Sequence, residues 1–275
     1  MTLHDRVPAI ETPSRVVRCP DCSMIFLTPR LATYENGWTN DPSFLETNYL
    51  PELELRGLCP RTRQLDRRRN ASWHSGIFKT LEQFATTRTL LDVGCSIGTT
   101  LLAAADRAWG ARGIELSAVL AGYGRNVLGV DIMTADFETA HLDAQDFDCV
   151  TMLDYLPHCF QPYHSLKRAH GMLRDGGVLF ASCPNVEGRA HLDYGIDWCC
   201  FVSDHYFYYS AESLTKSLVD AGFESVLVLR GLPLPNEPLH RQIRRLRGAR
   251  KRPVLEVHGD PLGDTLYAWA IKSSS

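Results

Sequence analysis

The chain has 275 residues, of which 44% are hydrophobic and 22% are charged, and its formal net charge at pH 7 is −3. These proportions are ordinary for one large globular domain, so they exclude wholesale disorder and a fibrous structure. No apolar run reaches the roughly 18 residues of a membrane span, and the first ten residues lack the apolar core of a signal peptide. The nine cysteines are scattered, as reduced thiols are. We expect a soluble cytoplasmic protein with no membrane partner.

Residues 1–60 contain seven prolines and no steady periodicity, so they are predicted to form an irregular N-terminal segment. Within it, Cys19-Pro20-Asp21-Cys22 has metal-ligand spacing, but a structural zinc ion takes four ligands. Cys59 is a candidate third ligand, and the segment holds no second C-x-x-C pair. The sequence therefore predicts no complete metal site and leaves zinc binding open.

From residue 61 onward, helical and strand patterns alternate. A helix is expected over residues 61–85, and further helices over 99–108, 117–127 and 163–173. Strands that alternate with helices are typical of an α/β fold with a parallel sheet and right-handed crossovers. The predicted strands are Thr89–Val93, Ala111–Glu115, Val130–Asp136, Phe147–Leu153 and Val178–Cys183.

The pattern changes after Pro184. Residues 185–210 are rich in aromatic side chains, a helix is expected over 211–221, and strands over 224–230 and 265–271. The last two strands are separated by an insert, residues 231–263, in which Arg241–Arg252 holds seven basic residues and no acid. A second basic run, Arg61–Arg69, holds five basic residues and one acid. Such runs attract anionic partners, although a solvated surface accounts for them equally well.

The most informative segment is Thr89–Thr100, TLLDVGCSIGTT. A buried strand ends at an acid, Asp92, and a turn with Gly94 and Gly98 leads into a helix. Glycines at these positions permit a tight turn and the close approach of a ligand to the backbone. The same residues also fit G-x-S-x-G, the nucleophile elbow of serine hydrolases, with Ser96 as nucleophile and His205 as base. That alternative gives no role to Asp92, and no oxyanion-hole segment precedes Ser96.

The residues after the glycine turn favour a nucleoside ligand. Glu115 ends the second strand, 17 residues after Gly98, where a carboxylate can accept hydrogen bonds from ribose hydroxyls. Asp136 and Phe137 end the third strand, where they offer an acceptor for an adenine amino group and a ring to stack on it. A dinucleotide dehydrogenase is disfavoured, because the two glycines do not supply the G-x-G-x-x-G spacing.

Six segments, in order, resemble the successive motifs of class I S-adenosylmethionine-dependent methyltransferases: LLDVGCSIGTTL, GIEL, TADF, FDCVTMLDYLPH, LRDGGVLFASCPN and DHYFYYSAESL. The resemblance spans residues 61–230, and the closing TLYAWAIK is similar to the last, antiparallel strand of that family. It implies a Rossmann-like α/β domain over residues 61–275 with strand order 3-2-1-4-5-7-6. It also implies S-adenosylmethionine as cofactor and S-adenosylhomocysteine as product.

The resemblance assigns cofactor-binding roles by matching position. Glu115 would bind the ribose, Asp136 and Phe137 would flank the adenine, and Leu153 and Asp154 would lie beside the methionine part. The methionine and ribose part would also be lined by Asp92, Gly94, Cys95, Ser96 and Gly98. Two departures stand out: Ser96 replaces the middle glycine of D-x-G-x-G-x-G, and Pro157-His158 stands where many relatives have Glu-His. Relatives of this subgroup often carry a zinc ribbon. The segment RCPDCSMIFLTPR resembles the second half of that ribbon.

Two histidines are candidates for the chemistry. A hydroxyl acceptor must lose its proton, and a histidine with a pKa near neutrality suits that task. His205 matches a histidine that recurs in the resembling subgroup, and His158 follows the fourth strand. The aromatic residues of 185–210 would form a lid over a flat or apolar acceptor.

We therefore predict methyl transfer to a small-molecule acceptor, free or linked to a nucleotide or a carrier protein. Oxygen is the first choice of acceptor atom, with carbon or nitrogen behind it. Nucleic acid is not expected as a partner, because Asp154-Tyr155-Leu156-Pro157 is not the motif of enzymes that methylate base amino groups. The alternatives are a serine hydrolase using Ser96 and a non-catalytic relative that binds anionic partners. The sequence does not predict the oligomeric state.

Overall fold

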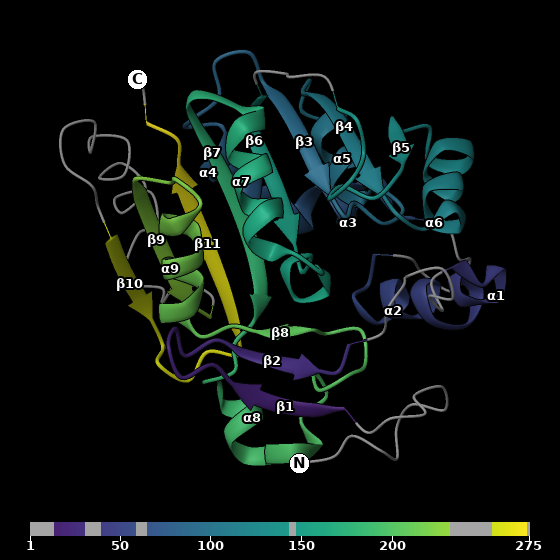
Figure 1. Ribbon diagram of the computed structural model, residues 1–275. Coiled ribbons are helices and arrows are strands. Elements are labelled where there is room, and N and C mark those ends of the chain that lie inside the picture. The colour runs from purple at the N-terminus through teal and green to yellow at the C-terminus, as the bar shows by residue number, and fades with distance from the viewer. Residues whose placement is uncertain (1–13, 31–39, 59–64, 143–146, 232–254, 274–275) are drawn as a thin grey trace. The chain divides into compact units, whose positions relative to one another are not determined.

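The computed structural model describes residues 14–30, 40–58, 65–142, 147–231 and 255–273 (Figure 1). The chain forms two compact units, one of residues 33–151 and one of residues 1–32 and 152–275. The basic run Arg241–Arg252, the first four residues of the run Arg61–Arg69, and Cys59 lie outside the described residues. In the part of the chain that is described, no helix has the length and apolar character needed to cross a membrane.

The unit of residues 33–151 is built on parallel strands in the order β6-β3-β4-β5. The interior positions of β3 are buried leucine and valine, as expected for a strand covered on both faces. Helix α5 packs on β3 and β4, and α6 packs on β4 and β5. The bounds are β3 Thr89–Val93, α5 Thr99–Ala105, β4 Gly110–Glu115, α6 Ala118–Tyr123, β5 Ile132–Thr134 and β6 Phe147–Leu153, whose last two residues belong to the other unit.

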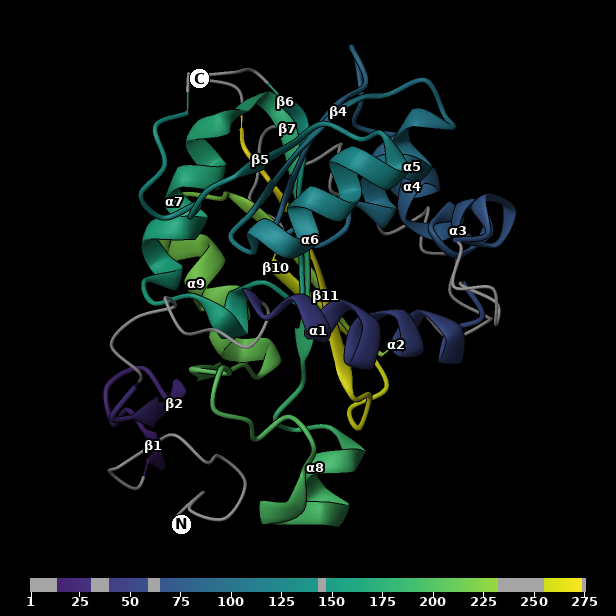
Figure 2. The ribbon, with the colours of Figure 1, turned by 90° about the vertical axis from the view of Figure 1, so that its right-hand side faces the viewer.

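The second unit contains strands in the order β7-β11-β9-β10. Strand β11 is antiparallel to both of its neighbours, as predicted for the last strand. Strands β5-β4-β3-β6 have the order predicted as 3-2-1-4, and strands β7-β11-β9 have the order predicted as 5-7-6. Helices α7 and α9 pack on β7 and β9 and contact each other (Figure 2). The bounds are α7 Pro162–Met172, β7 Leu173–Pro184, α9 Ala211–Asp220, β9 Ser225–Arg230, β10 Leu255–Gly259 and β11 Thr265–Ile271.

Strand β10 lies within the predicted insert, residues 231–263, where the sequence analysis expected no strand. It pairs in parallel with β9 along its whole length, from Leu255 opposite Val226 to Gly259 opposite Arg230. Its five residues, LEVHG, are too short and too polar to be recognised as a strand from periodicity alone. Pairing with β9 stabilises the extended conformation of these residues, which the local sequence alone does not favour.

Residues 1–60 are also more regular than predicted. Strands β1, Arg15–Arg18, and β2, Ile25–Thr28, form a hairpin, and β2 pairs with β8, Phe207–Tyr208, in a three-stranded sheet (Figure 1). Farther along, the chain is helical through α1, the π-helical turn η2 and α2. Two of the seven prolines that suggested irregular structure, Pro42 and Pro51, stand in the first two positions of α1 and α2, where proline is tolerated. The bounds are α1 Pro42–Phe44, η2 Leu45–Tyr49 and α2 Leu50–Leu55.

The long helix expected over residues 61–85 is two helices. Helix α3, Arg67–Trp73, begins after Asp66, whose carboxylate accepts hydrogen bonds from the amides of Arg68 and Arg69. His74 then ends α3, and α4, Ser75–Leu81, follows it. The apolar periodicity continues across the break, which is why the sequence indicated one helix.

Only glycine fits at position 113 of β4, because neighbouring side chains leave no room for a Cβ atom. A Cβ atom at this position would overlap Cys95 Sγ and would lie 2.7 Å from Leu101 Cδ1. We expect Gly113→Ala to lower the free energy of unfolding by roughly 1–3 kcal/mol, measured by urea denaturation. Gly122 of α6 is the matched control, because a Cβ there would meet nothing within 4 Å. Gly122→Ala should be neutral or stabilising by up to about 1 kcal/mol, and equal losses in the two variants would contradict the packing explanation.

Candidate functional site

The chain leaves β3 at Val93 and reaches α5 through a turn of left-handed residues. The φ angles are +68° at Gly94, +52° at Ser96 and +86° at Gly98. At Gly98 a Cβ atom would also lie 2.7 Å from Val130 Cγ2, so glycine is needed there for space as well as for conformation. Ser96, which stands at the middle glycine of D-x-G-x-G-x-G, adopts a left-handed conformation that is uncommon for a residue other than glycine, as residues at functional sites often do.

Glu115, at the end of β4, is joined to this loop. Its carboxylate accepts hydrogen bonds of 2.8 Å from the backbone amides of Ser96 and Ser117. Each carboxylate oxygen accepts one of these two bonds, so the backbone orients both oxygens at the end of β4, where the ribose is predicted to bind. The structure thus brings together Ser96 and Glu115, two of the residues predicted to bind the cofactor.

Asp92 is buried beneath the turn, with 2% of its surface exposed. Burial raises the pKa of its carboxyl group to about 7, although a hydrogen bond of 2.6 Å from Thr151 Oγ1 and another from the Thr100 side chain lower it. In the described ranges no ion pair includes Asp92. A buried acid without a cationic partner fits a ligand that carries positive charge, as the methionine part of S-adenosylmethionine does.

The residues after β5 form a tight turn. Asp136 Oδ1 accepts a hydrogen bond of 2.8 Å from the Glu138 amide, and Asp136 Oδ2 accepts one of 3.3 Å from Thr139 Oγ1. The ring of Phe137 is buried, with 3% of the residue exposed. The places of Asp136 and Phe137 at the end of β5 agree with the sequence, while their contacts with adenine stay a prediction.

Leu153 and Asp154 belong to the other unit, at the end of β6. Asp154 has a φ of +52°. Its amide donates a hydrogen bond of 3.0 Å to the Ser182 carbonyl, and Ser182 Oγ donates one of 3.1 Å to Asp154 Oδ1. A non-glycine residue held in this conformation indicates that the surrounding contacts fix it, as they often do at functional sites.

The structure brings the two predicted catalytic histidines into contact. The ring centroids of His158 and His205 are 4.6 Å apart, with an interplanar angle of 74°. His158 Nδ1 lies 2.8 Å from the Asp204 carbonyl oxygen, and His205 Nδ1 lies 2.9 Å from the Cys200 carbonyl oxygen. Carbonyl oxygens only accept, so each Nδ1 carries the proton. In the neutral rings, each Nε2 is therefore free to accept a proton.

His205 is held neutral by its surroundings. Burial and the neighbouring His158 lower the pKa of His205 to about 4, while Asp204 and the Cys200 carbonyl oppose this change. At pH 7 the imidazole is thus uncharged and its Nε2 lone pair is available. This state suits a group that accepts a proton in the reaction.

Most aromatic side chains of residues 185–210 pack against each other. Trp198 and Phe201 make an edge-to-face contact with centroids 5.1 Å apart, and Phe201 makes a similar contact at 4.9 Å with Tyr208. All three are at least 95% buried. Tyr206 stacks on Phe160 at 4.8 Å. These rings are part of the packed interior, whereas the exposed large apolar residues of the segment are Leu192, Tyr194, Ile196 and Val202.

Cys19 and Cys22 lie in the turn between β1 and β2. Hydrogen bonds from the backbone amides of Cys22 and Asp21 lower the pKa of the Cys19 thiol. Among the residues that the structure describes, no group of three or more metal-binding side chains is present. Zinc binding at this pair stays an open prediction.

Sequence reasoning missed three residues of the site. Thr151 and Thr100 contact the Asp92 carboxylate, and Tyr49 lies beside Ser96 and Glu115. A hydroxyl in the helical run after the turn or in the strand FDCVTML carries no distinctive pattern. Tyr49 lies in residues 1–60, where no motif was recognised.

Comparisons with known proteins agree with this geometry. A family model described as a methyltransferase domain matches residues 65–228. The ubiquinone biosynthesis O-methyltransferase of Coxiella burnetii is 31% identical over 121 residues, which cover 42% of this chain and 52% of that protein. The chain thus spans about half the length of the curated relatives that it matches.

Solved structures show the same fold. An S-adenosylmethionine-dependent methyltransferase from Thermotoga maritima has a TM-score of 0.57 at 18% identity and covers 86% of this chain and 100% of its own. One from Archaeoglobus fulgidus has a TM-score of 0.55 at 14% identity, with coverages of 82% and 99%. At these identities the likeness concerns the fold alone.

The chain belongs to the methyltransferase domain family, because the family model matches more than half of it. This confirms the predicted class I S-adenosylmethionine-dependent methyltransferase, its Rossmann-like fold and its cofactor. The serine hydrolase alternative is wrong. Among the described residues the Ser96 hydroxyl is buried and makes no hydrogen bond to a histidine, whereas a nucleophilic serine needs an adjacent base.

Proposed function

We propose that this methyltransferase transfers the methyl group to a hydroxyl oxygen of a small molecule. The observation that carries the proposal is the His158–His205 contact, in which both Nδ1 atoms face backbone carbonyl oxygens, so that a neutral ring has no proton on Nε2. The name of the Coxiella burnetii relative, an O-methyltransferase, supports oxygen as acceptor atom. The non-catalytic alternative rested on two basic runs. Arg241–Arg252 lies outside the described residues, and in the described part of the other run Arg67 and Arg69 pair with Asp106 and Asp66.

The protein's own residues would divide the work. Asp92 and Glu115 hold the cofactor, with the negative charge of Asp92 facing the methionine part and Glu115 accepting from the ribose hydroxyls. Asp136 and Phe137 flank the adenine, and Leu153 and Asp154 contribute on the methionine side. S-adenosylmethionine, when bound, supplies an electrophilic methyl group on a sulfonium sulfur. Alignment of the acceptor oxygen with that methyl group can lower the barrier by several kcal/mol.

His205 then accepts the hydroxyl proton at Nε2. A base with a pKa of about 4 is weak toward a free hydroxyl group. As the new oxygen–carbon bond forms, the oxygen gains positive character and its proton becomes strongly acidic. A weak, neutral base is then sufficient, and the Asp204 carboxylate beside the pair stabilises the imidazolium. His158, 4.6 Å from His205 between ring centroids, orients the acceptor or the base.

The test is transfer from labelled S-adenosylmethionine to a panel of probe acceptors that contains a catechol, a nucleoside-diphosphate sugar and a primary amine. We expect methylated product from a hydroxyl compound, identified by mass spectrometry as an ether. Transfer to the amine alone would contradict oxygen as the acceptor atom.

In parallel, calorimetric titration should show micromolar S-adenosylhomocysteine binding that falls at least tenfold in Glu115→Ala, because the ribose loses a charged acceptor.

A further inference from the structure

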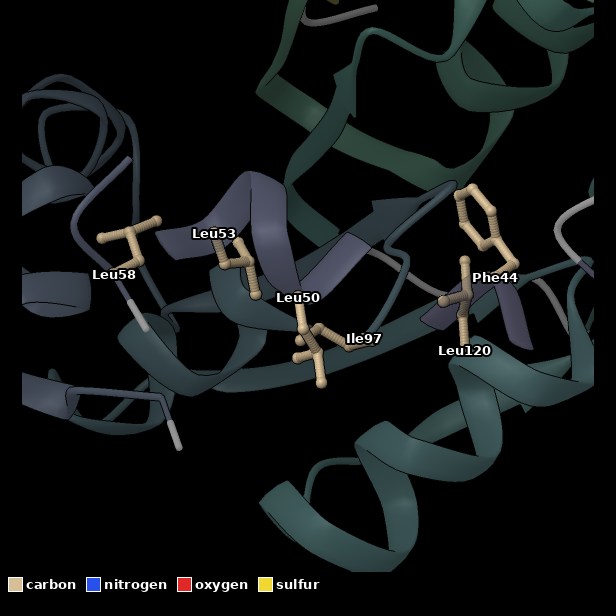
Figure 3. Packing of buried hydrophobic residues seen from close by; sticks show 6 residues of the cluster. All are labelled: Phe44, Leu50, Leu53, Leu58, Ile97 and Leu120. Carbon is tan, nitrogen blue, oxygen red and sulfur yellow. The ribbon is translucent and has the colours of Figure 1, made fainter. Parts of the chain in front are cut away.

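Residues 40–58 lie across the glycine turn, and we call them the strap. Four buried side chains of the strap, Phe44, Leu50, Leu53 and Leu58, form one hydrophobic cluster with Ile97 and Leu120 (Figure 3). Ile97 lies in the middle of the glycine turn and is fully buried. The strap therefore packs directly on the loop that binds the cofactor.

Both ends of the strap are fixed to elements that flank this loop. At one end, Asn40 Oδ1 accepts a hydrogen bond of 3.2 Å from the amide of Ala118, the first residue of α6. At the other end, the Asp66 amide donates to the Leu58 carbonyl at 2.7 Å, and Arg69 Nη1 donates to the Gly57 carbonyl at 3.1 Å. The strap is thus part of the folded unit of residues 33–151.

Tyr49 is the polar residue that the strap places at the loop. Tyr49 packs against the same hydrophobic cluster, beside Ile97 of the glycine turn. Burial raises the pKa of its hydroxyl to about 12, while a hydrogen bond with the Ser96 side chain lowers this pKa and the nearby Glu115 raises it. The hydroxyl therefore keeps its proton at physiological pH and can donate a hydrogen bond.

These observations define a small polar site under an apolar cover. The Glu115 carboxylate can only accept hydrogen bonds, whereas the Tyr49 hydroxyl can donate one. Vicinal ribose hydroxyls both donate and accept, so they match a carboxylate and a phenol that converge on them. We propose that Tyr49 binds the cofactor ribose, donating to one of the hydroxyl groups that Glu115 accepts from, while the strap excludes water from this pair. This inference rests on the placement of the ribose at Glu115 in the proposed function.

The test is calorimetric titration of the full chain with S-adenosylhomocysteine. Tyr49→Phe keeps the ring and removes only the hydroxyl, so we expect affinity to fall roughly 5- to 10-fold, as for one lost hydrogen bond. Tyr163→Phe is the matched control and should bind as the wild type does, because Tyr163 is an exposed residue of α7. Unchanged affinity in Tyr49→Phe would overturn the proposal.

Two analogues separate a ribose contact from general packing. With S-adenosylhomocysteine that lacks either the 2′- or the 3′-hydroxyl, the difference between Tyr49→Phe and wild type should disappear for one of the two. An equal loss with the parent ligand and with both analogues would also overturn the proposal. If wild type binds S-adenosylhomocysteine but Glu115→Ala binds it equally well, the ribose placement itself fails, which is a distinct result.

A second measurement does not depend on affinity. Arg56 follows α2 at the exposed end of the strap, so trypsin cleavage after it reports on how firmly the strap is held. At saturating S-adenosylhomocysteine we expect cleavage of the wild type to slow several-fold. Tyr49→Phe should show a clearly smaller protection at the same occupancy, and equal protection would contradict the role of the hydroxyl.

Discussion

Asp92→Asn is expected to stabilise the ligand-free protein and to weaken cofactor binding. The carboxyl group is buried, and its pKa is raised from 3.8 to about 7. The folded state therefore favours the protonated acid, and the stability that this gives is present at low pH and is lost as pH rises through about 7. At pH 8 the ionised carboxylate lowers the stability by up to about 4 kcal/mol. Asparagine carries no charge, so the variant should be more stable by roughly 2–4 kcal/mol in urea denaturation at pH 8.

The same substitution removes the charge that faces the methionine part of the cofactor. We expect S-adenosylhomocysteine affinity at pH 8 to fall roughly 10- to 100-fold, the effect of losing one charge-assisted contact. For the wild type, affinity should fall as pH is lowered below about 7, by at most tenfold per pH unit, because the protonated acid must first ionise. In the variant this pH dependence should be absent between pH 6 and 8.

Asp148 supplies the matched control, because it is also a fully buried aspartate of the same unit. Its carboxylate accepts hydrogen bonds from the amides of Thr86, Thr87 and Thr89, at 2.9, 2.7 and 3.2 Å. Asparagine would present an amide group to donors, so Asp148→Asn should destabilise the protein by roughly 2–4 kcal/mol. Loss of stability in both variants would show that Asp92 is an ordinary structural acid.

The acids of the site could be predicted from the sequence, whereas the hydroxyl that contacts Asp92 could not. Asp92 and Glu115 were identified because each stands at or near the end of a strand, and parallel strands present those ends to ligands. Asp154 was assigned by the resemblance to the methyltransferase family. Thr151 was not found, because a threonine inside a strand looks like any β-branched residue. Its function depends on the register of β6 beside β3, where Thr151 is opposite Asp92.

The strap could not be predicted from the sequence for a different reason. Its helices are short and contain Pro42 and Pro51 in their first two positions, so local sequence gave no sustained helical period. Its order comes from packing on Ile97 and Leu120, which follow it by about 40 residues or more in the chain. Contacts over such separations are set by the tertiary fold, and Tyr49 therefore carried no local signal.

His205→Gln is expected to abolish methyl transfer while leaving cofactor binding intact. Glutamine is similar in length and can hydrogen-bond, but it cannot accept a proton, so turnover should fall by roughly 10²- to 10⁴-fold. Because the pKa of His205 is about 4, the base is already unprotonated at pH 5.5. The wild-type turnover at saturating cofactor should therefore stay level from pH 8 down to about pH 5.5. An unperturbed histidine would instead lose activity below about pH 6.5.

The control for this prediction is His170, whose ring packs edge-to-face on Phe223 with centroids 5.0 Å apart. His170→Gln should keep full turnover with whichever hydroxyl probe the wild type methylates. His158→Gln should give a smaller loss than His205→Gln, since His158 contacts the base but does not itself accept the proton. A turnover loss that is equal in all three variants, or a His205→Gln variant with normal turnover, would remove His205 from the mechanism. Water would then have to accept the proton of the acceptor hydroxyl. Water is a strong enough base only if that hydroxyl is already strongly acidic.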